Sequence, residues 1–158
     1  AAVNGAAIAG GCGIATLCDF TLAADNATFG YTEVRVGFMP ALVSMFLERL
    51  AGEKVAHDLL LTGRIVSATE AKVLGLVTSI VESEQLLPAA RELAATLMAL
   101  SPGSLAATKR LLIRFSEAEI DRRISLAIAE SVAIRQTDDY REGIAAFLEK
   151  RKPRWSGR

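Results

Sequence analysis

The sequence predicts an α/β fold in which strands and tight turns come first and helices follow. Residues 1–32 are short apolar runs broken by Gly, Asn and Asp, the pattern of buried strands and turns. From Pro40 onward, apolar residues recur at the three- and four-residue spacing of amphipathic helices. The 158 residues, 51% of them hydrophobic, suffice for one globular core. We therefore expect a small piece of sheet in residues 1–82, covered by a helical region over residues 83–158.

The first helical stretch follows Pro40, a residue that suits a first helical position, and ends before Gly52. Residues 53–61 are expected to form a second short helix. The apolar face predicted for the first helix consists of Leu42, Met45, Phe46 and Leu50.

A third helix is expected to begin at Ser67. Ser67 and Glu70 have the three-residue spacing of a capping box, and Gly75 stops the helix. Residues 76–81 then form a brief strand.

The remaining sequence predicts four helices. Two are long and amphipathic, with a helix over about 104–115 between them and a last helix over 138–150. Their apolar positions are Leu86, Ala90, Leu93, Leu97 and Leu100 in one, and Ile120, Ile124, Ile128 and Val132 in the other. These faces belong either to the internal core or to contacts with other subunits.

Charge excludes two classes of partner. Eighteen Lys and Arg balance eighteen Asp and Glu, so no overall field would hold the chain on nucleic acid or an anionic membrane. A local excess of four positive charges lies in residues 141–158. Polar residues interrupt the apolar stretch at the start of these residues, and that stretch lacks the basic region of a signal peptide. We expect a soluble, cytoplasmic protein.

Cysteine and histidine content predicts neither a disulfide framework nor a metal site. Cys12 and Cys18 are expected to be buried free thiols, and His57, the only histidine, a surface or packing residue. The chain opens without Met on an apparent buried strand, residues 1–3, which indicates a start within a domain.

The glycine run from Gly10 to Gly13 is the first candidate for chemistry. Glycines let a ligand approach the backbone closely, and the helix expected from Ile14 would add a partial positive charge, so the turn could stabilise an oxyanion. The spacing matches neither the dinucleotide fingerprint nor the phosphate-binding P-loop. Close helix–strand packing explains the glycines equally well.

Several blocks, in order along the chain, resemble the crotonase family, also called enoyl-CoA hydratases/isomerases. They are residues 2–20 (AVNGAAIAGGCGIATLCDF), 29–40 (FGYTEVRVGFMP), 59–64 (LLLTGR), 68–71 (ATEA), 75–77 (GLV) and 147–151 (FLEKR). The resemblance implies a partial crotonase-like β/β/α spiral core with a C-terminal helical trimerisation region. It also implies a homotrimer or hexamer acting on acyl-CoA thioesters, with no metal or other cofactor.

In this family two backbone N–H groups stabilise a thioester enolate. By position, one donor would be that of Gly10, with Gly11 beside it at the substrate. The other donor belongs to an upstream loop that these residues do not include. The resemblance also assigns Phe147 and Lys150 to the CoA adenine and phosphates. A solvated helix end explains Lys150 as well.

Glu33 is the only side chain with an expected acid/base role. Hydratases of the family typically carry two glutamates, and the second position is Gly13 here. Burial in an apolar stretch would raise the pKa of Glu33, whereas a surface position or pairing with Arg35 would leave it without a catalytic role. The activity that the resemblance favours most is hydration of a 2-enoyl-CoA. The alternative is Δ3,Δ2-enoyl-CoA isomerisation with one glutamate as the proton carrier. A truncated, non-catalytic assembly subunit is the third possibility.

Overall fold

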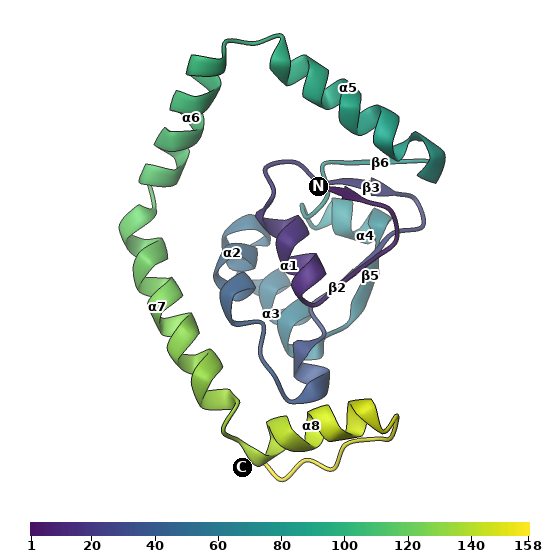
Figure 1. The fold of residues 1–158 in the computed structure, drawn as a ribbon, viewed down its shortest axis with the longest axis vertical. Coiled ribbons are helices and arrows are strands. Elements are labelled where there is room, and N and C mark those ends of the chain that lie inside the picture. The colour runs from purple at the N-terminus through teal and green to yellow at the C-terminus, as the bar shows by residue number, and fades with distance from the viewer.

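The computed structural model describes residues 1–158 and shows a compact core partly encircled by an arch of helices (Figure 1). Strands β1–β6 and helices α1–α4 form the core, and helices α5–α8 form the arch. The α/β class predicted from the sequence is therefore confirmed.

Two small three-stranded sheets lie in the core. In the first, β3 pairs in parallel with β1 on one side and β6 on the other, with Leu22 opposite both Ala2 and Ser79. In the second, β4 pairs in parallel with β2 and antiparallel with β5. The strands are β1 (Ala2–Val3), β2 (Ala6–Ile8), β3 (Leu22–Ala24), β4 (Thr28–Gly30), β5 (Ile65–Ser67) and β6 (Ser79–Val81). The strand expected at the start of the chain is confirmed and has its partner in β3.

Helix α1 (Gly10–Leu17) begins at Gly10, whereas the sequence predicted a turn up to Gly13 and a helix from Ile14. Glycine is a poor helix former, so the local pattern favoured a turn. In the folded chain these glycines are helical, because α1 packs against the rest of the core. Gly13 is buried where an added Cβ would lie 3.6 Å from the Cβ of Val43, so α1 packs closely on the next helix.

Helices α2 (Ala41–Ala51) and α3 (Glu53–Thr62) are confirmed. The apolar face predicted for α2 is right for Met45, which is buried, but wrong for Leu42 and Leu50. Leu42 and Leu50 are 51% and 49% exposed. The buried residues are Ala41, Val43, Met45 and Leu47. Helix α2 contacts α1, α3 and α7, and these neighbours rather than a single amphipathic stripe decide which residues are covered.

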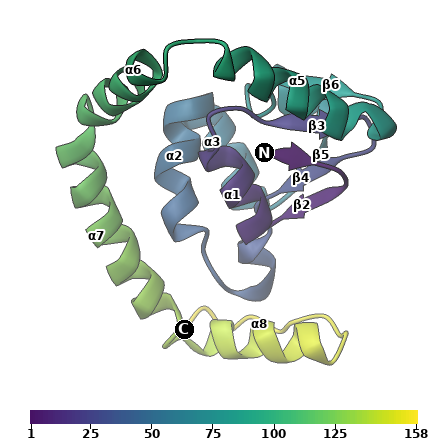
Figure 2. The same cartoon turned by 45° about the horizontal axis from the view of Figure 1, so that its top comes forward.

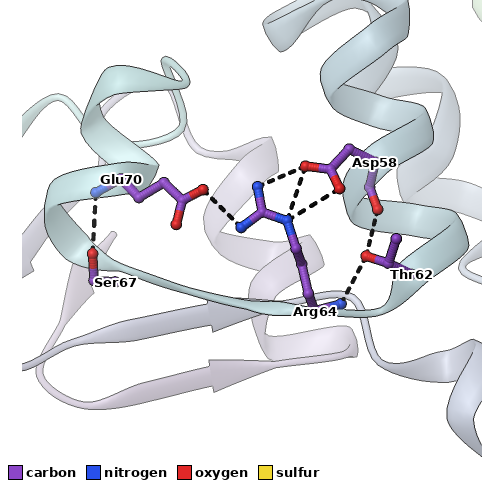
Figure 3. A network of polar contacts seen from close by, with 5 residues as sticks. All are labelled: Asp58, Thr62, Arg64, Ser67 and Glu70. Atoms are coloured by element: carbon purple, nitrogen blue, oxygen red, sulfur yellow. Dashed lines mark hydrogen bonds and ion pairs between the residues drawn. The ribbon is translucent and has the colours of Figure 1, made fainter.

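The corner between α3, β5 and α4 (Ala68–Val73) is held by Arg64 (Figure 3). Its guanidinium donates from Nε and a terminal nitrogen to Asp58, at 2.9 and 2.6 Å, and lies 2.7 Å from Glu70. Ser67 accepts from the Glu70 amide as an N-cap. Only this half of the predicted capping box forms, because the Glu70 carboxylate is bound to Arg64 instead.

The arch consists of α5 (Leu86–Met98), α6 (Pro102–Arg114), α7 (Glu117–Ile134) and α8 (Asp138–Leu148). All four predicted helices exist, although the last ends two residues early. The arch buries few of its own side chains: α6 buries none and α7 only Ala127. Ile128 and Val132, predicted on an apolar face, are 53% and 54% exposed. No helix is both long and apolar enough to span a membrane.

Candidate active site

A cavity of about 320 Å³ lies where the start of α1 meets the segment between β4 and α2. Gly10, Gly13 and Glu33 all line it, together with residues from the end of α7. Residues 10 and 33, singled out from the sequence as the centre of the site, are therefore brought together by the fold.

Glu33 begins a 3-10 turn, η1 (Glu33–Val36), three residues after the end of β4. Its carboxylate oxygen Oε2 is buried and has no hydrogen-bond partner. The pKa of Glu33 is raised above its ordinary value, chiefly because burial disfavours the charged form, and a hydrogen bond from its own amide opposes this shift. Pairing with Arg35 does not occur. Glu33 is thus a partly buried carboxyl with an uncommitted oxygen.

Gly10 is the first residue of α1. The first amide bonded along this helix is that of Gly13, which donates to the Ala9 carbonyl at 3.0 Å. Amides before Gly13 therefore have no acceptor within the helix, and they carry its partial positive charge. This end of α1 can bind an oxyanion at the cavity wall.

Ala9, immediately before α1, has a backbone conformation that non-glycine residues rarely adopt, with φ 51° and ψ −121°. Its amide donates to the Gly30 carbonyl at 2.7 Å, which ties the helix start to the end of β4. Strain of this kind persists where surrounding structure enforces it. The same tie fixes Gly10 relative to Glu33, which follows β4 by three residues.

The other residues assigned from the sequence lie outside this cavity. Gly11 is exposed and is not part of its lining. Phe147 is 68% exposed and lines a separate cavity with Ile8 and Thr32, while Lys150 is an exposed residue after α8. The fold thus unites Glu33 with Gly10 but does not bring Phe147 or Lys150 to them.

Several cavity residues were missed by sequence reasoning, among them Phe38, Ser131 and Arg135. The Arg135 guanidinium lies 5.3 Å from the centre of the Phe38 ring, within the range of a cation–π contact. Phe38 follows the glutamate block, but Arg135 ends α7 about a hundred residues later. No local pattern links such positions, and only the curve of the arch brings them together.

Neither the two thiols nor the histidine lines the cavity. Burial raises the pKa of Cys12, which keeps its sulfur protonated. Cys18 is exposed, so the prediction that both thiols are buried is wrong for this one. It follows the last turn of α1 and faces solvent. His57 is exposed and lies 3.9 Å from Glu53, one helical turn away.

A carboxyl in an apolar cavity beside the amino end of a helix is a site for proton transfer next to a developing oxyanion. The chain matches the family model "Enoyl-CoA hydratase/isomerase" over residues 1–158. It belongs to this family, and the resemblance to crotonases is confirmed.

Two relatives named as hydratases are similar to this chain over nearly its whole length. It is 48% identical over 155 residues to a Thermus thermophilus protein assigned to the enoyl-CoA hydratases, covering 98% of this chain and 61% of that one. It is 41% identical to the crotonyl-CoA hydratase of Syntrophomonas wolfei, covering 96% and 59%. The chain therefore spans about three fifths of these relatives.

The fold is that of solved family members. The crystal structure of an enoyl-CoA hydratase/isomerase from Pseudoalteromonas atlantica superposes with a TM-score of 0.90 at 32% identity, covering 97% of this chain and 62% of that one. The β-rich region and the helical arch are both included in this match. The crotonase fold predicted from the sequence is thereby confirmed.

Proposed function

We propose that the whole protein is an enoyl-CoA hydratase, which adds water across the double bond of a 2-enoyl-CoA thioester. One observation carries the proposal: the Glu33 carboxyl, partly buried with one uncommitted oxygen, shares a cavity with the amino end of α1 at Gly10. The names of the relatives support hydration over other reactions of the family.

In the proposed reaction, water attacks carbon 3 and the electrons of the double bond move to the thioester oxygen. The Gly10 amide binds the resulting oxyanion, aided by the dipole of α1, to which the next residue, Gly11, contributes as part of the same helix end. A second donor would come from a part of the protein outside these 158 residues. Such donors typically contribute about 3 kcal/mol each to transition-state stabilisation.

Glu33 carries the proton. Its carboxylate takes one proton from the attacking water and returns it to carbon 2 as the enolate collapses, so one water is added and the glutamate ends unchanged. The raised pKa of Glu33 suits a group that must both accept and return a proton. The reaction is redox-neutral, and we propose that it needs neither a metal nor another cofactor beyond the CoA of the substrate.

An isomerase is the second candidate, because Gly13 stands at the cavity wall where a second carboxylate is absent. A single carboxylate can remove a proton from carbon 2 of a 3-enoyl-CoA and deliver it to carbon 4. Hydration of crotonyl-CoA and isomerisation of a 3-enoyl-CoA, measured on the same preparation of the whole protein, separate the two reactions.

Glu33→Gln tests the site in either case. We expect the rate to fall by about 10²- to 10⁴-fold with binding of the CoA thioester retained, because the amide cannot exchange a proton. The exposed Glu84, on a 3-10 turn distant in sequence, supplies a matched control as Glu84→Gln. Full activity in Glu33→Gln would remove Glu33 from the mechanism. Binding without turnover in the unaltered protein would favour a non-catalytic assembly subunit.

We also propose that Phe147 and Lys150 hold the adenine and phosphates of CoA. Both are exposed at the carboxyl end of α8, as a contact with the long CoA moiety requires. Lys150→Ala should weaken binding of CoA thioesters while leaving turnover of short non-CoA thioesters unchanged. Equal loss with both substrates would contradict this role.

The exposed apolar residues of the arch support a homotrimer or hexamer. Leu111, Leu112 and Ile113 on α6 are each about half exposed or more, and exposed apolar patches of this kind mark interaction surfaces. Leu112→Glu should shift the native mass of the whole protein from an oligomer to a monomer. An unchanged mass would place the assembly contact elsewhere. A cytoplasmic location remains a prediction from the sequence.

A further inference from the structure

The turn that carries Glu33 is packed directly against helix α8. Both views show α8 beside the end of the core where this turn lies (Figures 1 and 2). The two segments are separated by about a hundred residues in the sequence. A displacement of α8 would therefore move the turn, and Glu33 with it, although no residue of the turn is substituted.

Two glycines allow this packing. A Cβ added to Gly143, in the middle of α8, would lie only 2.3 Å from the Val36 carbonyl oxygen. A Cβ added to Gly37 would lie 2.4 Å from the Asp139 carbonyl oxygen, and Gly37 also has a positive φ of 67°. Ordinary contacts between such atoms exceed 3 Å, so the backbones of α8 and the turn touch with no side chain between them.

The turn is also in contact with α3. A Cβ added to Gly63, the residue after α3, would lie 2.9 Å from a methyl group of Val34. Within the turn, the Phe38 amide donates to the Glu33 carbonyl at 3.0 Å. The turn is therefore held between α3 and α8 and has little freedom to move alone.

Helix α8 is in turn fixed by the segment that follows it. The Asp139 carboxylate accepts hydrogen bonds from the Ser156 amide, at 2.6 Å, and the Gly157 amide, at 3.0 Å. The Asp139 amide donates back to the Arg158 carbonyl at 3.2 Å. Next to this contact, the rings of Tyr140 and the cavity residue Phe38 lie 5.6 Å apart. These bonds tie residues 156–158 to the amino end of α8, beside the cavity.

We propose that α8 is a positioning element for Glu33, and that the Gly143–Val36 backbone contact sets how deeply the carboxyl sits in the cavity. The idea rests on the proposed function, in which Glu33 moves the proton. A side chain at position 143 must push α8 and the turn apart by about 1 Å to reach ordinary contact distance. Glu33 then becomes more exposed and is displaced from the reacting carbons.

The test compares Gly143→Ala with Gly103→Ala in the whole protein. Both changes place alanine in a helix, where it is intrinsically favoured, but an added Cβ at Gly103 has no atom within 4 Å. We expect Gly143→Ala to lower kcat by about 10- to 100-fold, the scale of a 1 Å displacement of a catalytic group, with a much smaller effect on KM. Gly103→Ala should leave both constants unchanged.

A second readout distinguishes positioning from a general loss of structure. Because burial raises the pKa of Glu33, greater exposure should move its titration, and the acid limb of the pH–rate profile, to lower pH. Arg35 on the same turn and Arg135 at the cavity donate no hydrogen bond to the buried Oε2. The Cys12 thiol and Tyr31 hydroxyl also interact with Glu33, but burial raises their pKa values and keeps them neutral, so they add no charge that could cause the shift. Carbon-13 NMR of the Glu33 carboxyl measures this titration without turnover.

The outcomes separate the two proposals. An unchanged Glu33 titration and kcat in Gly143→Ala overturn the positioning role while leaving the proposed function intact. Full activity in Glu33→Gln overturns the proposed function, whereas the NMR titration still decides whether α8 sets the burial of the carboxyl. If Gly143→Ala does not fold, Asp139→Ala loosens the same helix through residues 156–158. Asp139→Ala must then move the Glu33 titration to lower pH as well. A titration that stays unchanged in Asp139→Ala overturns the proposal.

Discussion

Helices α2 and α6 have similar lengths, eleven and thirteen residues, and both contain several leucines. Their surroundings differ completely. Helix α2 contacts α1, α3 and α7, and its Leu47 is fully buried. Helix α6 buries no residue, and its Leu112 is 60% exposed. One helix is therefore stabilised by this chain, whereas the other has an apolar surface that only a further surface can cover.

The comparison shows where the stability of the fold comes from. Most helical stability in proteins comes from packing of an apolar face rather than from intrinsic propensity. The core residues, including Phe29, Tyr31 and Leu59, form one buried cluster that supports β2, β4 and α3. Helices α6 and α7 add little to that cluster. We therefore expect substitutions in the core to lower the free energy of unfolding much more than substitutions in α6 or α7.

The largest effect is expected from Leu47→Ala. Removing a fully buried leucine should lower the free energy of unfolding by about 2–5 kcal/mol, because transfer energy is lost and a cavity is left. The matched change Leu112→Ala should cost below about 0.5 kcal/mol in a monomer. Denaturant unfolding of the whole protein measures both. A loss of several kcal/mol for Leu112→Ala would show that α6 is buried in an assembly.

A smaller effect is expected on acidification, at the end of the arch. Hydrogen bonds from Arg151 and the Arg154 amide lower the pKa of Glu142 from 4.5 to about 2, and bonds from Ser156 also lower that of Asp139. A lowered pKa means that the carboxylates stabilise the folded state above pH 4.5 and that this contribution is lost as the pH falls toward 2. The segment after α8 should then be released.

Trp155, the only tryptophan, lies in that segment and reports the release. Its fluorescence should shift to longer wavelength between pH 4.5 and pH 2 while far-ultraviolet circular dichroism changes less. In Glu142→Gln, part of the shift should already be present at pH 7. Coincidence of the two signals across the titration would instead indicate that the core and the segment unfold together.

The smallest effect is expected at Ala9. Ala9→Gly removes the strain of a positive φ at the start of α1 and should stabilise the fold by up to about 1 kcal/mol. Ala95→Gly, the same change in the exposed face of α5, should destabilise it by about 0.5–1 kcal/mol. Thermal unfolding compares the pair. Destabilisation by both would indicate that the conformation of Ala9 carries little strain.

The sequence predicted helices and their ends well where the signal lies within a few neighbouring residues. Ser67 does cap α4, Gly52 and Gly75 do lie beyond helix ends, and the four helices of the arch were all expected. Errors arose where packing overrides propensity. Gly10 begins a helix, α1, that packs on α2 through the buried Gly13, and Glu70 leaves its capping position for Arg64.

The site was predicted only in part, because some of its residues are close in the sequence and others are not. Glu33 and Gly10 lie in neighbouring sequence blocks, on consecutive segments joined by β3 and β4, and the fold does bring them to one cavity. Arg135 and the contact of Gly143 with Val36 come from the far end of the arch. Their sequence neighbourhoods contain no sign of a catalytic turn.

The sequence by itself determined the order of strands, glycine-rich segment and helices, and the carboxylate on which the proposed chemistry depends. These features follow from residue types and short spacings. Only the tertiary structure decided that Glu33 lies in the cavity with its Oε2 buried and unpaired, and that α8 lies against its turn. Burial and backbone contact between distant segments are properties of how elements pack, which short-range spacing does not encode.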